Sequence, residues 1–322
     1  MKTKASNKYF IFDKPQKRGI KGLVKGILRS LEIAKYKRVQ AFSKKAPIVE
    51  KKYNVSICAI FKNEAPYLDE WISYHLLVGV NHFYMYNNNS EDDYLSVLQK
   101  YIDQGVVTLV QWERNQAQME CYLDCIDNFS SQTKWLGFID IDEFINPIDY
   151  EDVYSFLKKY ENKYGSVVIY WKFFGTSGLK DRDRKGLVCE DFTSCWPKHS
   201  NIGKCFLNTA YQIDRENHTI CLHHRLWTKR GKIALPPVNH CGKFDIEYHH
   251  KVNKHFPIQI NHYFTKSYGE YIDKKSKGDV YFKINPHDEE YFHRHEDKCS
   301  AKETTIFKYI PALKNEMKKY GR

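Results

Sequence analysis

The sequence predicts an α/β fold in which a mostly parallel central sheet is flanked by helices. Between residues 54 and 171, short apolar runs of strand type alternate with amphipathic segments of helical periodicity. Polar or turn-forming residues follow these apolar runs, as ligand-binding loops do at the carboxyl ends of parallel strands. At 322 residues the chain is also long enough to bury a full core as one large domain with extensions.

The regular part of the pattern begins at residue 54. We predict strands over 55–61, 82–86, 106–110, 135–141 and 166–171, separated by helices over 65–78, 91–104, 117–129 and 150–164. Pro66 suits the first turn of the first helix, Ser90 can cap the second, and Gly165 can end the fourth. Beyond 171 the periodicity is less regular up to about 278, and an amphipathic helix is expected over 302–320.

Charge divides the chain into an arm and a body. Residues 1–52 hold 16 Lys and Arg against three acidic residues, whereas the remainder holds 35 against 36. We therefore predict a basic, partly amphipathic arm over 1–52, a folded domain over 53–278 and a C-terminal extension over 279–322. Because the body is not basic, no nucleic-acid partner is expected.

The arm carries an amphipathic pattern, with apolar residues at helical spacing and basic residues on another face. Such helices lie on anionic membranes, so residues 1–52 are a candidate membrane-binding segment. A disordered or intramolecularly docked extension is the alternative. The apolar residues are Ile20, Leu23, Val24, Ile27, Leu31 and Ala34.

The cysteines and the hydropathy give an expectation for localisation. The nine cysteines lack paired spacing and are expected to be reduced, buried thiols. No apolar run approaches the roughly 20 residues that span a bilayer, and no signal-peptide pattern is found. We expect a cytoplasmic protein, or one peripheral on the inner face of the cytoplasmic membrane.

Asp140 and Asp142 at the end of the fourth strand are the most informative pair in the chain. Alternation along a strand points both carboxylates to one side, where their repulsion favours a cation between them. Oxygen ligands suit Mg2+ or Mn2+. The alternative is an acidic loop that caps the following helix.

Absent motifs narrow the ligand class. There is no Gly-x-Gly-x-x-Gly after the first strand and no Gly-x-x-x-x-Gly-Lys-Ser/Thr in the chain. A nucleotide-binding sheet that holds phosphates through a metal on Asp-x-Asp is typical of nucleotide-sugar transferases.

Five motifs, taken in order, resemble glycosyltransferase family 92, a GT-A group related to family 2. They are residues 55–64 with Tyr67-Leu68-x-Glu70-Trp71 and Gly79-Val80-x-His82, then Gln118-x-x-x-Tyr122-x-Asp124-Cys125, residues 135–144, Trp171-x-x-Phe174-Gly175-Thr176-Ser177-Gly178, and Asn261-His262-Tyr263-x-x-Lys266-Ser267. The resemblance covers roughly residues 54–278, although 214–255 match the family poorly.

The resemblance implies a GT-A, Rossmann-like sheet and a metal-dependent, inverting transferase. Its donor would be a UDP-sugar, most often of galactose, and its acceptor a glycan or lipid-linked glycan in surface polysaccharide synthesis. The metal, Mn2+ or Mg2+, would be held by Asp140, Asp142 and His262, with Asp142 in direct contact and Asp140 toward the ribose or a metal-bound water. A core histidine is the alternative for His262.

The donor nucleotide is expected over the first strand ends. The candidate donor-binding residues are Ile60, Asn63, Glu64, Asn88, Arg114, Gln118, Asp124 and Asp140. Helix capping is the alternative for Asn63 and Glu64, a turn for Asn88, and the surface for Arg114 and Asp124.

An inverting transfer needs a carboxylate as general base near the acceptor. Asp181, Asp183, Glu190 and Asp191 follow the 174–178 loop, and Glu190, with Asp191 beside it, matches best the position where the family carries an acid. Surface acids are the alternative. The candidate wall of the acceptor and sugar pocket consists of Trp171, Phe174, Gly175, Thr176, Ser177, Lys204 and Lys266.

Two other functions fit the sequence less well. A catalytically idle glycan- or membrane-binding protein with the same fold would not need both aspartates, and both are present. A zinc site at His293, His295 and Cys299 lacks a second pair of ligands at finger distance.

Overall fold

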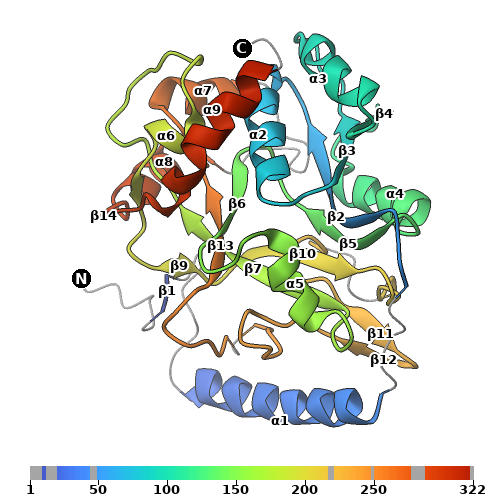
Figure 1. Ribbon diagram of the computed structural model, residues 1–322. Helices are drawn as coiled ribbons and strands as arrows, with labels where there is room; N and C mark the ends of the chain where they lie inside the picture. The colour runs from blue at the N-terminus through green and yellow to red at the C-terminus, as the bar shows by residue number, and fades with distance from the viewer. Residues whose placement is uncertain are drawn as a thin grey trace.

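The computed structural model describes residues 9–11, 20–43, 49–216, 221–247, 250–276 and 287–319. Parts of the predicted arm, and residues 279–286 and 320–322 of the predicted extension, lie outside them. The centre of the molecule is an eight-stranded sheet with the order β4-β3-β2-β5-β10-β7-β13-β6 (Figure 1).

Six strands of this sheet run in one direction and two run against them. β2 (Tyr53–Phe61), β3 (His82–Asn87), β4 (Val107–Gln111) and β5 (Thr133–Phe138) are mutually parallel, as the sequence predicts. β10 (Gly203–Asn208) is antiparallel to β5 and to β7 (Ser166–Phe173). β13 (Ile258–His262) continues parallel to β7, and β6 (Glu143–Pro147) closes the edge antiparallel to it. The mostly parallel sheet is therefore confirmed.

Two hydrophobic cores lie on opposite faces of the sheet. Along β2, Ile57 and Ala59 pack in the core that contains Trp71 of α2 (Ala65–Leu77), whereas Cys58 and Ile60 pack in the core that contains α4 (Gln118–Phe129). This alternation follows from the two-residue period of a strand. α3 (Tyr94–Asp103) and α9 (Ile310–Lys319) pack beside α2.

Two predicted helices differ from those observed. The segment predicted over 150–164 forms only α5 (Val153–Leu157) and a 3₁₀ turn over Lys158–Tyr160, because Asp152 caps the helix late by accepting from the backbone N–H of Ser155. The helix predicted over 302–320 begins later than expected, as α9 at Ile310. Before it, β14 (Ala301–Lys302) pairs with β8 (Ser194–Cys195), and Thr305–Tyr309 form a 3₁₀ turn.

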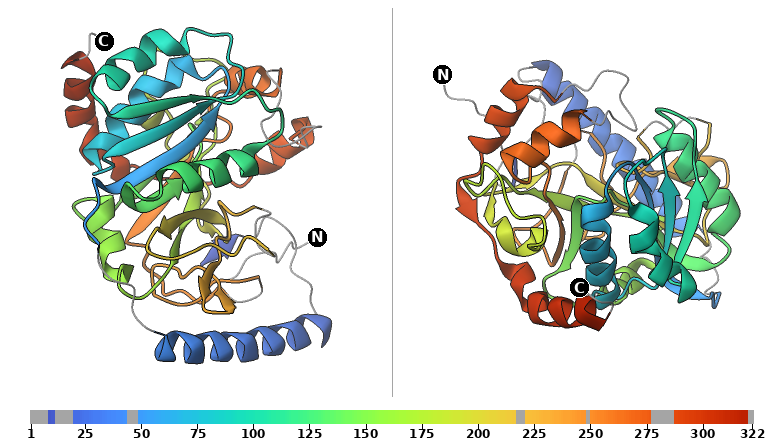
Figure 2. Two further views of the ribbon diagram at one scale, coloured as in Figure 1. Left: turned by 90° about the vertical axis from the view of Figure 1, so that its right-hand side faces the viewer. Right: turned by 90° about the horizontal axis from the view of Figure 1, so that it is seen from above.

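The remaining elements surround the second half of the sheet. They are β1 (Phe10–Ile11), β9 (His199–Ser200), β11 (Thr228–Arg230), β12 (Ile233–Leu235), α6 (Val188–Asp191), α7 (Tyr268–Ser276) and α8 (Glu289–Glu296). α1 (Ile20–Phe42) runs along the outside of the molecule beneath β11 and β12, apart from the central sheet (Figures 1 and 2). None of the described helices is long and apolar enough to cross a bilayer.

Candidate active site

The two predicted aspartates lie in the turn between β5 and β6. The indole Nε1 of buried Trp71 donates to the carbonyl oxygens of Asp140 at 3.1 Å and Glu143 at 2.9 Å. The backbone N–H of Asp140 donates to Glu143 Oε2 at 3.3 Å. These bonds hold the turn in place, so its acidic residues stay at the carboxyl end of the parallel strands.

Sheet pairing brings His262 to the same place. His262 ends β13 and lies opposite Glu143 of β6 in the antiparallel ladder. Its Nε2 is 3.6 Å from Asp142 Oδ2 and 3.9 Å from Glu143 Oε1. We call Asp142, Glu143 and His262 the acid–histidine cluster.

The acid–histidine cluster has the composition of a divalent cation site. One ligand atom from each residue lies within 4.8 Å of the others. Glu143 Oε1 and His262 Nδ1 are buried and have no hydrogen-bond partner among the described residues. Two carboxylates and an imidazole suit Mn2+ or Mg2+. These residues therefore fit the implied metal. The group contains Glu143 in place of the predicted Asp140, which lies beside it.

Two lysines neutralise the carboxylates. Lys274 Nζ of α7 lies 2.5 Å from Asp142 Oδ2. Fully buried Lys204 Nζ of β10 donates to Asp140 Oδ2 at 2.8 Å and is 3.5 Å from Glu143 Oε1. The site thus contains carboxylates that suit a cation and ammonium groups that suit a diphosphate.

Burial and these neighbours separate the pKa values of the two buried acids. Burial alone would raise the pKa of Asp142, but Lys274 and His262 hold it well below its ordinary value. Burial raises the pKa of Glu143 well above its ordinary value, against the opposing charge of Lys204. The cationic neighbours thus favour the charged form of Asp142, whereas burial disfavours the charged form of Glu143.

The structure places several predicted donor residues at the same sheet edge. Gln118 Nε2, at the start of α4, donates to Asp140 Oδ1 at 3.3 Å. Asn63 has a φ of 54° and accepts from the backbone N–H of Glu91, while Glu64 is the N-cap residue of α2 without a side-chain capping bond. Ile60 is buried in β2. Ile60, Asn63 and Glu64 end or follow β2, whereas Gln118 follows β4.

The other donor candidates have structural partners. Asn88 Nδ2 donates to the carbonyl oxygens of Trp112 at 2.8 Å and Arg114 at 2.9 Å, so it ties together the loops after β3 and β4. Arg114 also lies over the Trp112 ring at 5.2 Å. Asp124 accepts from Tyr86 Oη at 2.6 Å. Their part in donor binding remains a prediction.

The predicted sugar-pocket residues divide into two groups. Trp171 is buried with its ring 4.7 Å from that of His262, and its Nε1 has no hydrogen-bond partner in the part of the chain that the structure describes. Lys204 contacts Asp140 directly, and Lys266, with a φ of 48°, lies 4.2 Å over the ring of Tyr67. This first group adjoins the acid–histidine cluster.

The second group is a loop held by α8. Thr176 donates to Glu296 through its backbone N–H and its hydroxyl, the latter at 2.8 Å. A Cβ on Gly175 would lie 2.6 Å from Glu296 Oε1 and 2.7 Å from Cys299 Sγ, so a larger residue there would have to displace these two side chains. Phe174 O accepts from His295, and Ser177 Oγ accepts from two backbone N–H groups of residues 193 and 194.

The predicted catalytic acids lie on α6, and both have cationic partners. Glu190 is paired with Lys314 of α9 at 2.7 Å, and Asp191 with Arg182 at 2.8 Å. Within the described residues neither is hydrogen-bonded or ion-paired to Asp140 or to the acid–histidine cluster. Buried Glu70 anchors their helix by accepting from the backbone N–H of residue 188 at 2.7 Å.

Sequence reasoning missed Glu143 and Lys274 as site residues. Glu143 directly follows the Asp-x-Asp pair, and this adjacency was the available signal. Lys274 has no such signal, because only the docking of α7 brings it to Asp142.

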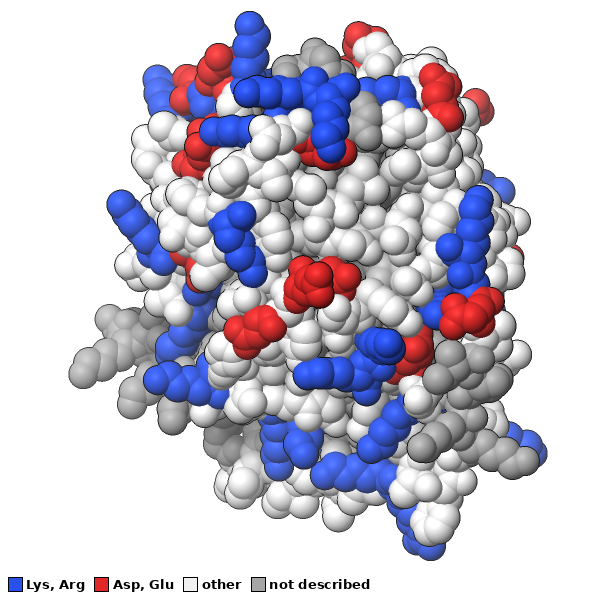
Figure 3. Space-filling model, viewed as in Figure 1, with Lys and Arg blue, Asp and Glu red and all other residues white. Residues whose placement is uncertain are grey.

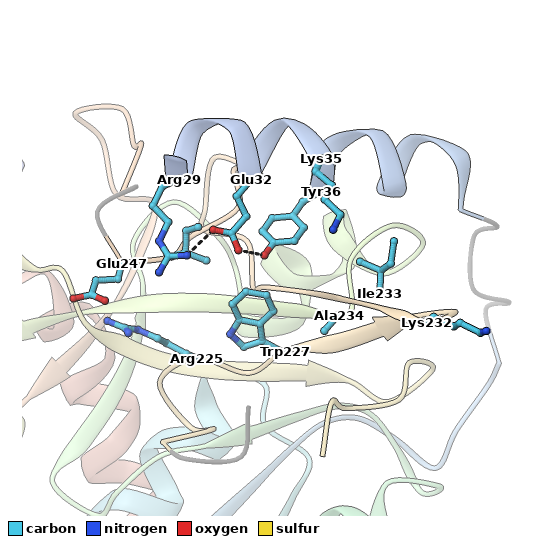
Figure 4. A pocket seen from close by; sticks show the side chains of 11 residues that line it. Arg29, Glu32, Lys35, Tyr36, Arg225, Trp227, Lys232, Ile233, Ala234 and Glu247 are labelled. Carbon is cyan, nitrogen blue, oxygen red and sulfur yellow. Dashed lines mark hydrogen bonds and ion pairs between the residues drawn. The ribbon is translucent and has the colours of Figure 1, made fainter. Parts of the chain in front are cut away.

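A cavity of about 550 Å³ between α1 and the body of the protein is not part of this site. It is lined by Arg29, Glu32, Lys35, Tyr36, Arg225, Trp227, Lys232, Ile233, Ala234, Ile246 and Glu247 (Figure 4). None of these residues belongs to the acid–histidine cluster.

Comparison with known proteins agrees with this arrangement. The profile of glycosyltransferase family 92 matches residues 51–291. The chain belongs to glycosyltransferase family 92. A family 92 protein of Ricinus communis is 31% identical over 143 residues, which cover 43% of this chain and 26% of that protein. One of Oryza sativa is 30% identical over 141 residues, covering 43% and 24%. Galactan beta-1,4-galactosyltransferase GALS3 of Arabidopsis thaliana is 30% identical over 125 residues, covering 34% and 25%.

The matched parts are about a quarter of the length of these relatives. Among solved structures, S. aureus TarS residues 1–349 match with 15% identity and a TM-score of 0.34, over 49% of this chain and 47% of that one. The evidence for the GT-A, Rossmann-like fold of this family 92 chain is therefore its own strand order and its family membership.

Proposed function

We propose that this family 92 glycosyltransferase moves a sugar from a UDP-sugar to a glycan or lipid-linked glycan in a reaction that requires Mn2+ or Mg2+. The observation that carries the proposal is the acid–histidine cluster, buried at the carboxyl end of a parallel sheet beside Asp140. A bound cation there would supply positive charge for the departing diphosphate.

The chain's own residues have separate tasks in this proposal. Asp142, Glu143 and His262 hold the cation, and Lys204 fixes Asp140 for the ribose or a metal-bound water. With a cation held at Asp142, the ammonium group of Lys274, which is now paired with that carboxylate, would be available to diphosphate oxygens. Charge-assisted contacts of this kind are strongest in a site that excludes water.

The donor sugar proposed is galactose. It is supported by the relative named as a galactosyltransferase. Inversion would use Glu190 or Asp191 as general base. For the acceptor we propose a surface polysaccharide or lipopolysaccharide precursor, extended in the cytoplasm or on the inner face of the cytoplasmic membrane.

A panel of nucleotide sugars tests the proposal. Each is added with Mn2+ and with chelator, while thermal stability and slow donor hydrolysis are measured. We expect one UDP-sugar to raise the Tm and to be hydrolysed only with metal, because binding to the folded state alone stabilises it. Asp142→Asn should abolish both effects, whereas Asp127→Asn, on the surface of α4 and paired with Arg215, should keep them.

Two outcomes would contradict the proposal. Full metal-dependent hydrolysis by the Asp142→Asn variant would show that the reaction does not need the acid–histidine cluster. Binding of a UDP-sugar without hydrolysis or transfer, under any metal, would favour a catalytically idle glycan-binding protein with the same fold.

A further inference from the structure

α1 is docked with its apolar side turned away from the protein. Seven of the ten large hydrophobic side chains exposed in the described residues belong to this helix, whereas surface helices ordinarily bury their apolar face. They are Ile20 (81% exposed), Leu23 (67%), Val24 (48%), Ile27 (54%), Leu28 (58%), Leu31 (64%) and Phe42 (82%). We call these seven side chains the outer apolar face.

The polar side of α1 faces the body. Ile33 and Tyr36 are its buried residues, and the Tyr36 ring packs against Trp227 at 5.8 Å and Phe244 at 5.9 Å. Gln40 Nε2 donates to the carbonyl oxygen of Lys163 at 2.6 Å. These contacts fix which side of the helix points outward.

A polar cavity lies beneath the helix beside these contacts. Arg29 and Glu32 form an ion pair in it, and the Tyr36 hydroxyl donates to Glu32 (Figure 4). The charged groups of the inner face thus have partners and solvent on the body side. The need to keep charged groups in solvent therefore does not explain why the outer apolar face is exposed.

Basic residues surround the outer apolar face. α1 contains six Lys and Arg and a single acid, Glu32. Lys21, Lys25 and Lys37 are exposed. Figure 3 shows Lys and Arg side chains gathered over the lower part of the molecule, where α1 runs. An apolar face bordered by cations complements the acyl chains and headgroups of an anionic bilayer.

We propose that α1 lies in the plane of an anionic phospholipid membrane, with the outer apolar face in the acyl region and the folded body held against the surface through Tyr36. The family profile begins at residue 51, so α1 lies outside the matched region. Because the helix is docked on the body, it sets the orientation of the enzyme on the membrane as well as its attachment.

A second copy of the chain fits this face less well. Two α1 helices packed through their outer apolar faces would place two sets of basic residues against each other, with one acid on each side to offset them. Like charges brought together in this way oppose association.

Vesicle sedimentation tests the proposal with the full chain. The probes are vesicles of phosphatidylcholine with and without phosphatidylglycerol. We expect retention on the anionic vesicles, and a loss of about a hundredfold in partitioning for the triple variant L23Q/I27Q/L31Q. Leu95→Gln on α3, which removes a side chain 47% exposed elsewhere, should partition like the parent chain.

The basic residues have a separate signature. The double variant K21E/K25E should lose roughly twentyfold or more on anionic vesicles and little on neutral ones. Added salt should weaken binding of the parent chain. Circular dichroism and Tm must match the parent in every variant, because the substituted residues are exposed.

Three outcomes would overturn the proposal. One is the absence of retention of the parent chain on anionic vesicles, and another is equal retention of the triple variant. The third is a concentration-dependent dimer, seen by analytical ultracentrifugation, that the triple variant abolishes while the parent chain ignores vesicles. These readouts need no donor or transfer activity, so they are independent of the proposed function.

Discussion

Replacement of Lys274 by Met should strengthen metal binding. Lys274 Nζ lies 2.5 Å from Asp142 Oδ2 and competes with a cation for that oxygen. The lysine side chain is 39% exposed, so solvent screening reduces the pair to about 1–2 kcal/mol. Removing the competitor should therefore lower the Kd for Mn2+ by about 5- to 30-fold.

The assay is quenching of tryptophan fluorescence by Mn2+. The Trp171 ring lies 4.7 Å from the ring of His262, close enough to report occupation of the acid–histidine cluster. Lys275→Met, which removes the next lysine on α7, is exposed and serves as the matched control. An unchanged or raised Kd in Lys274→Met, with an unchanged Tm, would show that the cation does not bind at Asp142.

Two further predictions concern catalysis and pH. Glu190→Gln should lower transfer by about 10²–10⁴-fold with UDP binding intact. Lys314→Met, which breaks only the 2.7 Å pair, should remain active; equal losses in both would make Glu190 structural. Burial lowers the pKa of His75 to about 3, against its bond to Trp71 O. The unfolded chain binds this proton near pH 6.5, so the free energy of unfolding should fall below that pH by up to about 1.4 kcal/mol per unit. His75→Gln should flatten this slope in urea titrations, and an unaltered slope would refute the assignment.

The first half of the sheet could be predicted because its signals are local. The four parallel strands β2 to β5 are apolar runs with turn residues after them, and α2 to α4 carry helical periodicity. The predicted cap Ser90 lies before the observed N-cap of α3, Asp93, which makes no side-chain capping bond within the described residues. Observed bounds differ by a few residues, as helix and strand ends ordinarily do. The Asp-x-Asp pair followed from the same local pattern.

In the second half of the sheet only β7 could be predicted, over 166–171, because pairing between distant segments decides the other three strands. β6 follows β5 after one turn but pairs with β13, more than a hundred residues later. β10 enters between β5 and β7 against their direction. Neither strand has a period strong enough to be recognised alone, since long-range contacts fix register and direction. Glu143 and Lys274 belong to the site for the same reason.

The loop predicted to contact the acceptor is shaped by residues beyond the family match. Glu296 of α8 binds Thr176 through two groups and lies against Gly175, yet the matched region ends at residue 291. Glu296 also accepts from Thr265, three residues after His262, at 3.3 Å. One carboxylate thus connects the predicted acceptor wall to the strand that carries the histidine of the acid–histidine cluster. If this wall selects the acceptor, relatives that share only the matched region can share the donor site and still differ in the glycan they extend.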